Sequence, residues 1–146
     1  MARLAVAWKG PLMTSTEIYV SLLEHFARYF DATDRGDLDE LAAILADATV
    51  VTPSVETSDP AVVRAAYAAR HPAPGRDGRR LVKNHATNLI VDGPDQVGFL
   101  TATVYYTRVE PGDGAAAITT SGRIAEQVVR DGDRWRVLRH TVIPDI

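Results

Sequence analysis

The sequence predicts an α+β domain in which helices of the N-terminal half pack against a curved antiparallel sheet. Two observations predict it. Apolar residues recur at helical spacing up to about residue 70 and then alternate with polar residues along four long runs. Short turns rich in Gly, Pro and Asp join these runs, as expected for antiparallel neighbours. Helices first and strands afterwards is the α+β order.

Three helices are expected before the sheet. The first begins at Thr14, where a glutamate three residues later completes a capping box, and it ends at Gly36, which can adopt the left-handed conformation of a helix C-terminus. Asp37 caps the second helix. Asp59 caps the third, and the proline that follows suits a first helical position.

A short strand at 49–52 and four long strands are expected. The long strands are predicted at 81–91, 96–109, 116–130 and 134–143. The Asp-Gly pair at 131–132 predicts a two-residue hairpin between the last two. Because long, twisted strands curl, the helices can close a cone over the concave face of the sheet.

Composition excludes several classes of function. The 146 residues fit one domain, predicted at 14–146, and residues 1–13 are predicted to be a loose leader. The absence of cysteine excludes thiol nucleophiles and disulfides and suits a cytoplasmic protein. A net charge of −3 does not favour nucleic-acid binding, and no apolar run is long enough to cross a membrane. Four histidines without cysteine or tight spacing predict no metal site.

Four segments resemble a known family. They are Tyr29–Leu38, His85–Asn88, Ser121–Arg123 and Trp135–Arg139. Together they resemble the SnoaL-like members of the nuclear transport factor 2-like superfamily over nearly the whole chain. The superfamily includes scytalone dehydratase, bile-acid dehydratase, ketosteroid isomerase and polyketide cyclases. The resemblance implies a cone-shaped, cystatin-like fold with an internal pocket for a small hydrophobic organic ligand, no cofactor, and a homodimer.

The same resemblance implies three catalytic residues. Dehydratase-type members use a tyrosine near the end of the first helix, an aspartate five residues later and a histidine at the start of the first long strand; Tyr29, Asp34 and His85 match these positions. A histidine oriented by a carboxylate can move a proton near neutral pH, and a tyrosine hydroxyl can stabilise a developing oxyanion. The further acidic residue or histidine of those dehydratases has no counterpart in the stretch 105–108.

Each of the three residues also has a structural interpretation. Asp34 lies in a turn, where aspartate commonly caps its own backbone. Tyr29 lies on an apolar helix face, and His85 lies among polar neighbours on a strand. Catalysis by this set requires Asp34 and His85 within hydrogen-bonding distance and facing one cavity.

Turn lengths give a provisional strand register. Pairing Val91 with Gln96 places His85 opposite Ala102, and the other turns extend that face. The predicted pocket wall, which carries the substrate-binding residues, then contains Tyr106, Ser121, Arg123 and His140. On the opposite face Glu126 is predicted to form an ion pair with Arg139. A slip of one residue reverses these faces.

The sequence therefore favours a cofactor-independent acid–base enzyme, a lyase or isomerase of the dehydratase, isomerase or cyclase type. Its expected substrate is a small hydrophobic carbonyl compound, such as a polyketide or a steroid-like molecule. The alternative is a non-catalytic module of the same fold that binds a small molecule or mediates dimerisation.

Overall fold

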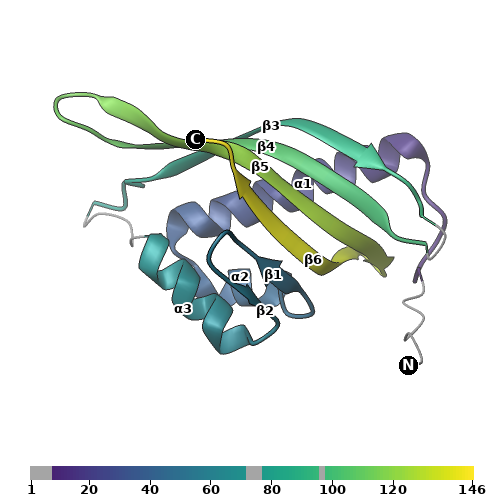
Figure 1. The fold of residues 1–146 in the computed structure, drawn as a ribbon. Helices are drawn as coiled ribbons and strands as arrows, with labels where there is room; N and C mark the ends of the chain where they lie inside the picture. Colours follow the sequence, from purple (N-terminus) through teal and green to yellow (C-terminus); the bar gives the residue numbers. More distant parts are fainter. Residues whose placement is uncertain (1–7, 72–76, 96–97) are drawn as a thin grey trace.

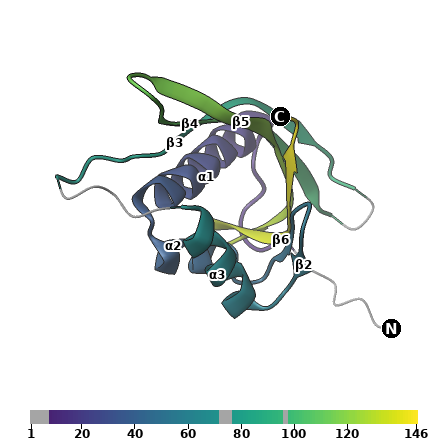
Figure 2. The same cartoon turned by 60° about the vertical axis from the view of Figure 1, so that its left-hand side comes forward.

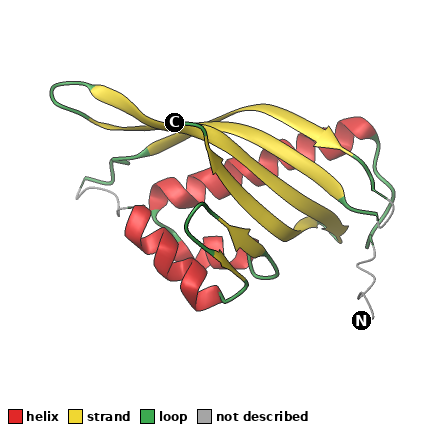
Figure 3. Cartoon of the chain, viewed as in Figure 1, coloured by secondary structure: helices red, strands yellow, loops and turns green. Residues whose placement is uncertain are grey.

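The computed structural model, which describes residues 8–71, 77–95 and 98–146, has helices packed on one six-stranded sheet (Figure 1; coloured by element type in Figure 3). The α+β prediction is confirmed. The helices are α1 (Ser15–Arg35), α2 (Leu38–Ile44) and α3 (Pro60–Arg70). The strands are β1 (Thr49–Val51), β2 (Glu56–Thr57), β3 (Lys83–Asp92), β4 (Leu100–Pro111), β5 (Ala116–Asp131) and β6 (Arg134–Pro144).

The sheet has the strand order β2-β1-β6-β5-β4-β3. The four long strands form the expected antiparallel meander, but β1 pairs parallel to β6, with Val50 opposite His140, so the sheet is mixed. Figure 2 shows the sheet curving around α1, with α2 and α3 at one end of the concave side. This arrangement sets one end of α1, α3 and the concave sheet face around a common space.

Local chemistry fixes the ends of α1 as predicted. The Thr14 hydroxyl accepts a hydrogen bond from the Glu17 amide at 3.2 Å, and the Glu17 carboxylate accepts one from the Thr14 amide at 2.7 Å. At the other end Gly36 adopts a left-handed φ of 66°. These two caps fix where α1 begins and ends, and packing of its apolar face in the core directs Leu22, Phe26 and Tyr29 inward.

Part of the predicted leader packs on the domain. The Lys9 amide donates to the Arg130 carbonyl at 2.8 Å, and the Gly132 amide donates to the Lys9 carbonyl at 2.8 Å. Trp8 packs edge-on against Trp135, with ring centroids 5.6 Å apart. Residues 1–7 of the predicted leader lie outside the described residues.

The predicted register of β3 is wrong. His85 pairs with Thr107, not Ala102. The connection to β4 is longer than predicted, so that Val91 pairs with Ala102 and not with Gln96, and β3 also carries a bulge between Thr87 and Ile90, where Asn88 has a φ of 53°. The pairing beyond the bulge, Val91 with Ala102, would place His85 on the concave face if it continued unbroken. The extra residue turns His85 to the outer face.

The predicted partner of Glu126 is wrong for the same kind of reason. A bulge in β6, where Leu138 is the extra residue opposite the step from Gln127 to Val128, sets Glu126 opposite His140, so both side chains lie on the concave face. Arg139 instead donates to Glu56 at 2.7 Å on the surface. None of the described helices is long and apolar enough to cross a membrane.

Candidate functional site

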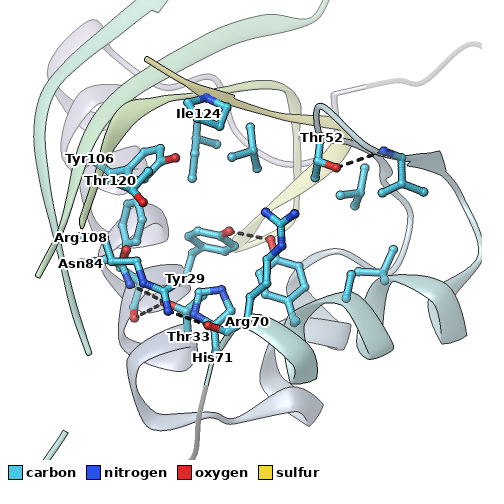
Figure 4. A pocket seen from close by; sticks show the side chains of 18 of the residues that line it. Tyr29, Thr33, Thr52, Arg70, His71, Asn84, Tyr106, Arg108, Thr120 and Ile124 are labelled. Atoms are coloured by element: carbon cyan, nitrogen blue, oxygen red, sulfur yellow. Dashed lines mark hydrogen bonds between the residues drawn. The ribbon is translucent and has the colours of Figure 1, made fainter. Parts of the chain in front are cut away.

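A cavity of about 300 Å³ lies between α1, α3 and the concave face of the sheet (Figure 4). Its size falls at the lower end of the roughly 300–1,000 Å³ usual for small-molecule pockets. Apolar side chains form much of the wall: Phe30, Val50, Val55, Val63, Ile124 and Val142. The polar side chains are Tyr29, Thr33, Thr52, Ser54, Thr57, Tyr67, Arg70, His71, Asn84, Tyr106, Arg108 and Thr120.

Two tyrosine hydroxyls meet at the wall of this pocket. Tyr29 from α1 and Tyr67 from α3 lie with their hydroxyl oxygens 2.6 Å apart, and both side chains are buried (Figure 4). The Tyr67 hydroxyl also lies 3.3 Å from Nε2 of His140 on β6. The pair therefore connects the pocket to a histidine in the core.

Behind the tyrosines, one carboxylate joins two histidines. Oε2 of Glu126 lies 2.6 Å from Nδ1 of His140, and Oε1 lies 2.7 Å from Nε2 of His25 on α1. Glu126 and His140 are fully buried, while the His25 side chain is 10% exposed. A continuous hydrogen-bonded chain thus runs from His25 through Glu126, His140 and Tyr67 to Tyr29. We call it the core relay.

Electrostatics set the protonation of the core relay. Burial acts to raise the pKa of Glu126, but the charge and hydrogen bonds of His25 and His140 outweigh it and hold that pKa well below its usual range. Because an ionised carboxylate only accepts hydrogen bonds, we assign a proton to Nδ1 of His140. Its Nε2 then faces the Tyr67 hydroxyl.

Burial keeps the two phenols neutral. It raises the pKa of Tyr29 well above its usual value, with a further contribution from Tyr67, and it also raises the pKa of Tyr67. Both groups therefore act as neutral hydroxyls at physiological pH, able to donate and accept hydrogen bonds, rather than as resident phenolates.

Asp34 belongs to a second polar cluster, formed with Thr33 and Asn84 and separate from the core relay. Its carboxylate accepts hydrogen bonds from the Asn84 amide nitrogen at 3.1 Å and from the Asn84 side-chain nitrogen at 2.7 Å. The Thr33 hydroxyl lies 3.4 Å away. These contacts join the end of α1 to the start of β3 through neutral donors. The side chain of β3 that meets Asp34 is thus Asn84, one position before His85.

The structure brings together only some of the predicted site residues. Tyr29 and Tyr106 line the pocket, and His140 lies behind Tyr67. His85 is exposed on the outer face, so Asp34 and His85 do not form the predicted pair. Two other predicted substrate-binding residues also lie on the outer face, where Arg123 pairs with Asp145 at 3.2 Å and Ser121 is half-buried.

Sequence reasoning missed three members of the core relay: His25, Tyr67 and Glu126. One signal was available, because His25 and Tyr29 are four residues apart and so share a face of the first helix. Glu126 was hidden by the bulge that sets its register. Within the described residues, no group of three or more His, Cys, Asp or Glu side chains is arranged to hold a metal ion.

Comparisons with known proteins agree on the family and the fold. Residues 14–141 match the model of the SnoaL-like domain. The protein Aln2 from a Streptomyces species has a similar structure, with 22% identity, a TM-score of 0.73 and coverage of 92% of this chain and 95% of that one. A candidate scytalone dehydratase from Novosphingobium aromaticivorans gives 16% identity, a TM-score of 0.70 and coverage of 92% and 89%.

A third similar structure is a Nostoc punctiforme protein of unknown function with a cystatin-like fold. It gives 17% identity, a TM-score of 0.72 and coverage of 92% of this chain and 96% of that one. At these identities the likeness to solved structures shows the fold alone. No curated protein matches the chain.

Proposed function

Because the chain belongs to the SnoaL-like domain family, whose fold encloses a small-molecule pocket, we propose that it is a cofactor-independent acid–base enzyme acting on a small hydrophobic carbonyl compound. The core relay carries the proposal. It connects a histidine, backed by an ionised carboxylate, to the pocket through the hydroxyl groups of Tyr67 and Tyr29.

The relay can run in either direction. With His140 neutral, its Nε2 accepts from Tyr67 and Tyr67 accepts from Tyr29, which leaves an oxygen lone pair of Tyr29 for a substrate proton. With His140 protonated, the donors reverse, and the Tyr29 hydroxyl donates to a substrate oxygen as negative charge develops there. In both directions Glu126 stabilises the imidazolium and fixes the ring.

This chemistry suits removal of a proton next to a carbonyl group, followed by loss of water, double-bond migration or ring closure. The catalytic groups we propose are Tyr29 and Tyr67, which line the pocket, and His140 is the group that stores the proton. Glu126 and His25 are positioning residues, because they act through His140. His85 has no role in this proposal.

The direct test is a spectroscopic screen of small cyclic hydroxyketones and enones for dehydration or double-bond migration. Once a compound that the wild type converts is found, the turnover rates of Tyr67→Phe and His140→Gln are compared with the rate of His85→Ala. Loss of a positioned acid–base group typically costs about 10²–10⁴-fold in rate. We expect losses in that range for the first two variants and none for His85→Ala.

Circular dichroism and urea unfolding of each variant separate loss of chemistry from loss of structure. A folded Tyr67→Phe protein with the wild-type rate would contradict the proposal. The rival function, a pocket that binds without chemistry, is favoured by the neutral environment of Asp34. Tight binding of compounds that the wild-type protein never converts would support it.

We also propose that the protein forms a homodimer through the outer face of the sheet. Tyr105 and Ile90 on this face are 40% and 46% exposed, and together they offer apolar surface that a second copy of the chain would cover. Light scattering coupled to size-exclusion chromatography should give twice the chain mass for the wild type and less for Tyr105→Glu. A monomeric wild-type protein would contradict this proposal.

A further inference from the structure

The charged side chains at the pocket wall are of one sign. Arg70 and Arg108 both line the cavity, whereas no Asp or Glu side chain of the described residues does so. Arg70 extends from the end of α3 into the pocket, and Arg108 lies on the sheet side near Asn84 (Figure 4). An apolar cavity with two guanidinium groups at its wall favours a ligand with negative charge.

Arg70 and Arg64, the two arginines of α3, differ in whether an acidic side chain pairs with them. Among residues 8–71, 77–95 and 98–146, no acidic side chain forms an ion pair with Arg70. The other arginine of α3, Arg64, pairs with Asp39 at 2.8 Å on the surface. A cation that enters a pocket instead of pairing at the surface is available to a ligand.

Arg108 is only partly satisfied. Its Nη2 donates to the Arg70 carbonyl at 2.6 Å and to Glu110 at 3.0 Å, and its side chain is 16% exposed. Within the described part of the chain, its Nε is buried without a hydrogen-bond partner, as is Nδ1 of His71, another pocket residue. A buried N–H without a hydrogen-bond partner destabilises the free protein, and a ligand oxygen that accepts from Nε of Arg108 would remove that cost.

Glu110 does not cancel the positive potential. Burial, then the charges of Arg108 and Arg70, lower the pKa of His71 to about 4, against the opposing effect of Glu110. At the position of His71 the two arginines therefore outweigh the acid. The hydrogen bond from Arg108 to the Arg70 carbonyl also offsets part of the negative end of the α3 dipole.

We infer that the ligand of this pocket carries a carboxylate, which Arg70 and Arg108 bind while the apolar wall holds the rest of a compact ring system. This inference rests on the proposed function, because it names the class of compound that the same pocket takes. It narrows the expected substrates from small hydrophobic carbonyl compounds to those with an acidic group.

Three fluorescent probes test the inference: 2-naphthol, 6-hydroxy-2-naphthoate and the methyl ester of the latter. All three offer a hydroxyl group to the tyrosines, and only the second carries a carboxylate. We expect the naphthoate to bind at least about tenfold more tightly than its ester, about 1.4 kcal/mol. The preference should vanish in Arg70→Gln and persist in Arg64→Gln, the matched control on the same helix.

The possible outcomes separate the two proposals. Weaker binding of 2-naphthol to Tyr29→Phe, together with equal affinity of the wild type for naphthoate and ester, would overturn the carboxylate inference and leave the proposed function standing. Failure of all three probes to bind would overturn both. A naphthoate preference that survives both Arg70→Gln and Arg108→Gln would also overturn the carboxylate inference.

Discussion

Two buried carboxylates lie beside the pocket, and they differ in what surrounds them. Asp34 accepts hydrogen bonds from the backbone and side-chain nitrogens of Asn84, groups that do not titrate near neutral pH. Glu126 lies between two imidazoles, His25 and His140, at 2.7 and 2.6 Å. Although both carboxylates are buried, only Glu126 contacts groups that can gain or lose a proton near neutral pH.

The partner of each buried acid, more than the acid itself, thus decides what the acid does. Asp34 holds the end of α1 against β3, so its effect is structural. Glu126 holds a titratable ring whose other nitrogen faces a hydroxyl of the pocket, so its effect reaches the ligand. Substitutions at the two sites should therefore affect stability and chemistry in different proportions.

The largest effect is expected for Glu126→Gln. Removing one member of a buried ionic pair commonly costs about 3–5 kcal/mol, and the histidines would lose their shared acceptor. We expect a loss of stability near the lower figure in urea unfolding, together with loss of turnover. Glu56→Gln, which removes the exposed partner of Arg139, is the control and should cost at most about 1 kcal/mol. Equal losses in the two variants would contradict the account.

Asp34→Ala should separate structure from chemistry. The Asn84 donors lose their acceptor, which predicts a cost of about 1–3 kcal/mol in the free energy of unfolding. In the folded variant the affinity for 2-naphthol should stay within about twofold, a change of under about 0.5 kcal/mol. A turnover defect as large as that of His140→Gln would instead return Asp34 to the catalytic set.

A smaller effect concerns the pH dependence of stability. The pKa of His71 is lowered from 6.5 to about 4 by folding, so between these values the unfolded chain binds more protons than the folded one. Stability should therefore fall as pH decreases from 6.5 to about 4. His71→Asn should show a shallower decline in urea unfolding across this window. Parallel curves for the two proteins would contradict the assigned environment of His71.

The smallest effect is expected for His85→Ala. The side chain is exposed on the outer face of β3, so the free energy of unfolding should change by no more than about 0.5 kcal/mol. Affinity for 2-naphthol should be unchanged. A clear loss of binding would mean that β3 adopts the unbroken register, with His85 directed into the pocket.

Most elements of the fold were predictable because their signals are local, whereas the two-residue strand β2 was not predicted. Thr14 and Gly36 mark the ends of α1, and the change from helical to alternating periodicity marks the start of the sheet. The parallel pairing of β1 with β6 was not predictable in this way, because it joins segments about 90 residues apart. Local patterns carry no information about such a contact.

The site was less predictable because its composition depends on strand register. The bulge at Asn88 decides that Asn84, and not His85, faces Asp34. Asparagine tolerates the left-handed region, but one such residue in a strand is a weak sign of a bulge. Tyr29 was named from the family resemblance, and its place at the pocket wall depends on a helix face and not on cross-strand pairing.

The most direct test of the core relay is a crystal structure of the complex with 2-naphthol. We expect the naphthol oxygen to lie within hydrogen-bonding distance of the Tyr29 or Tyr67 hydroxyl, with the contact between Tyr67 and His140 retained. A naphthol oxygen bound at Asn84 or on the outer face, with both tyrosine hydroxyls facing only each other, would contradict it.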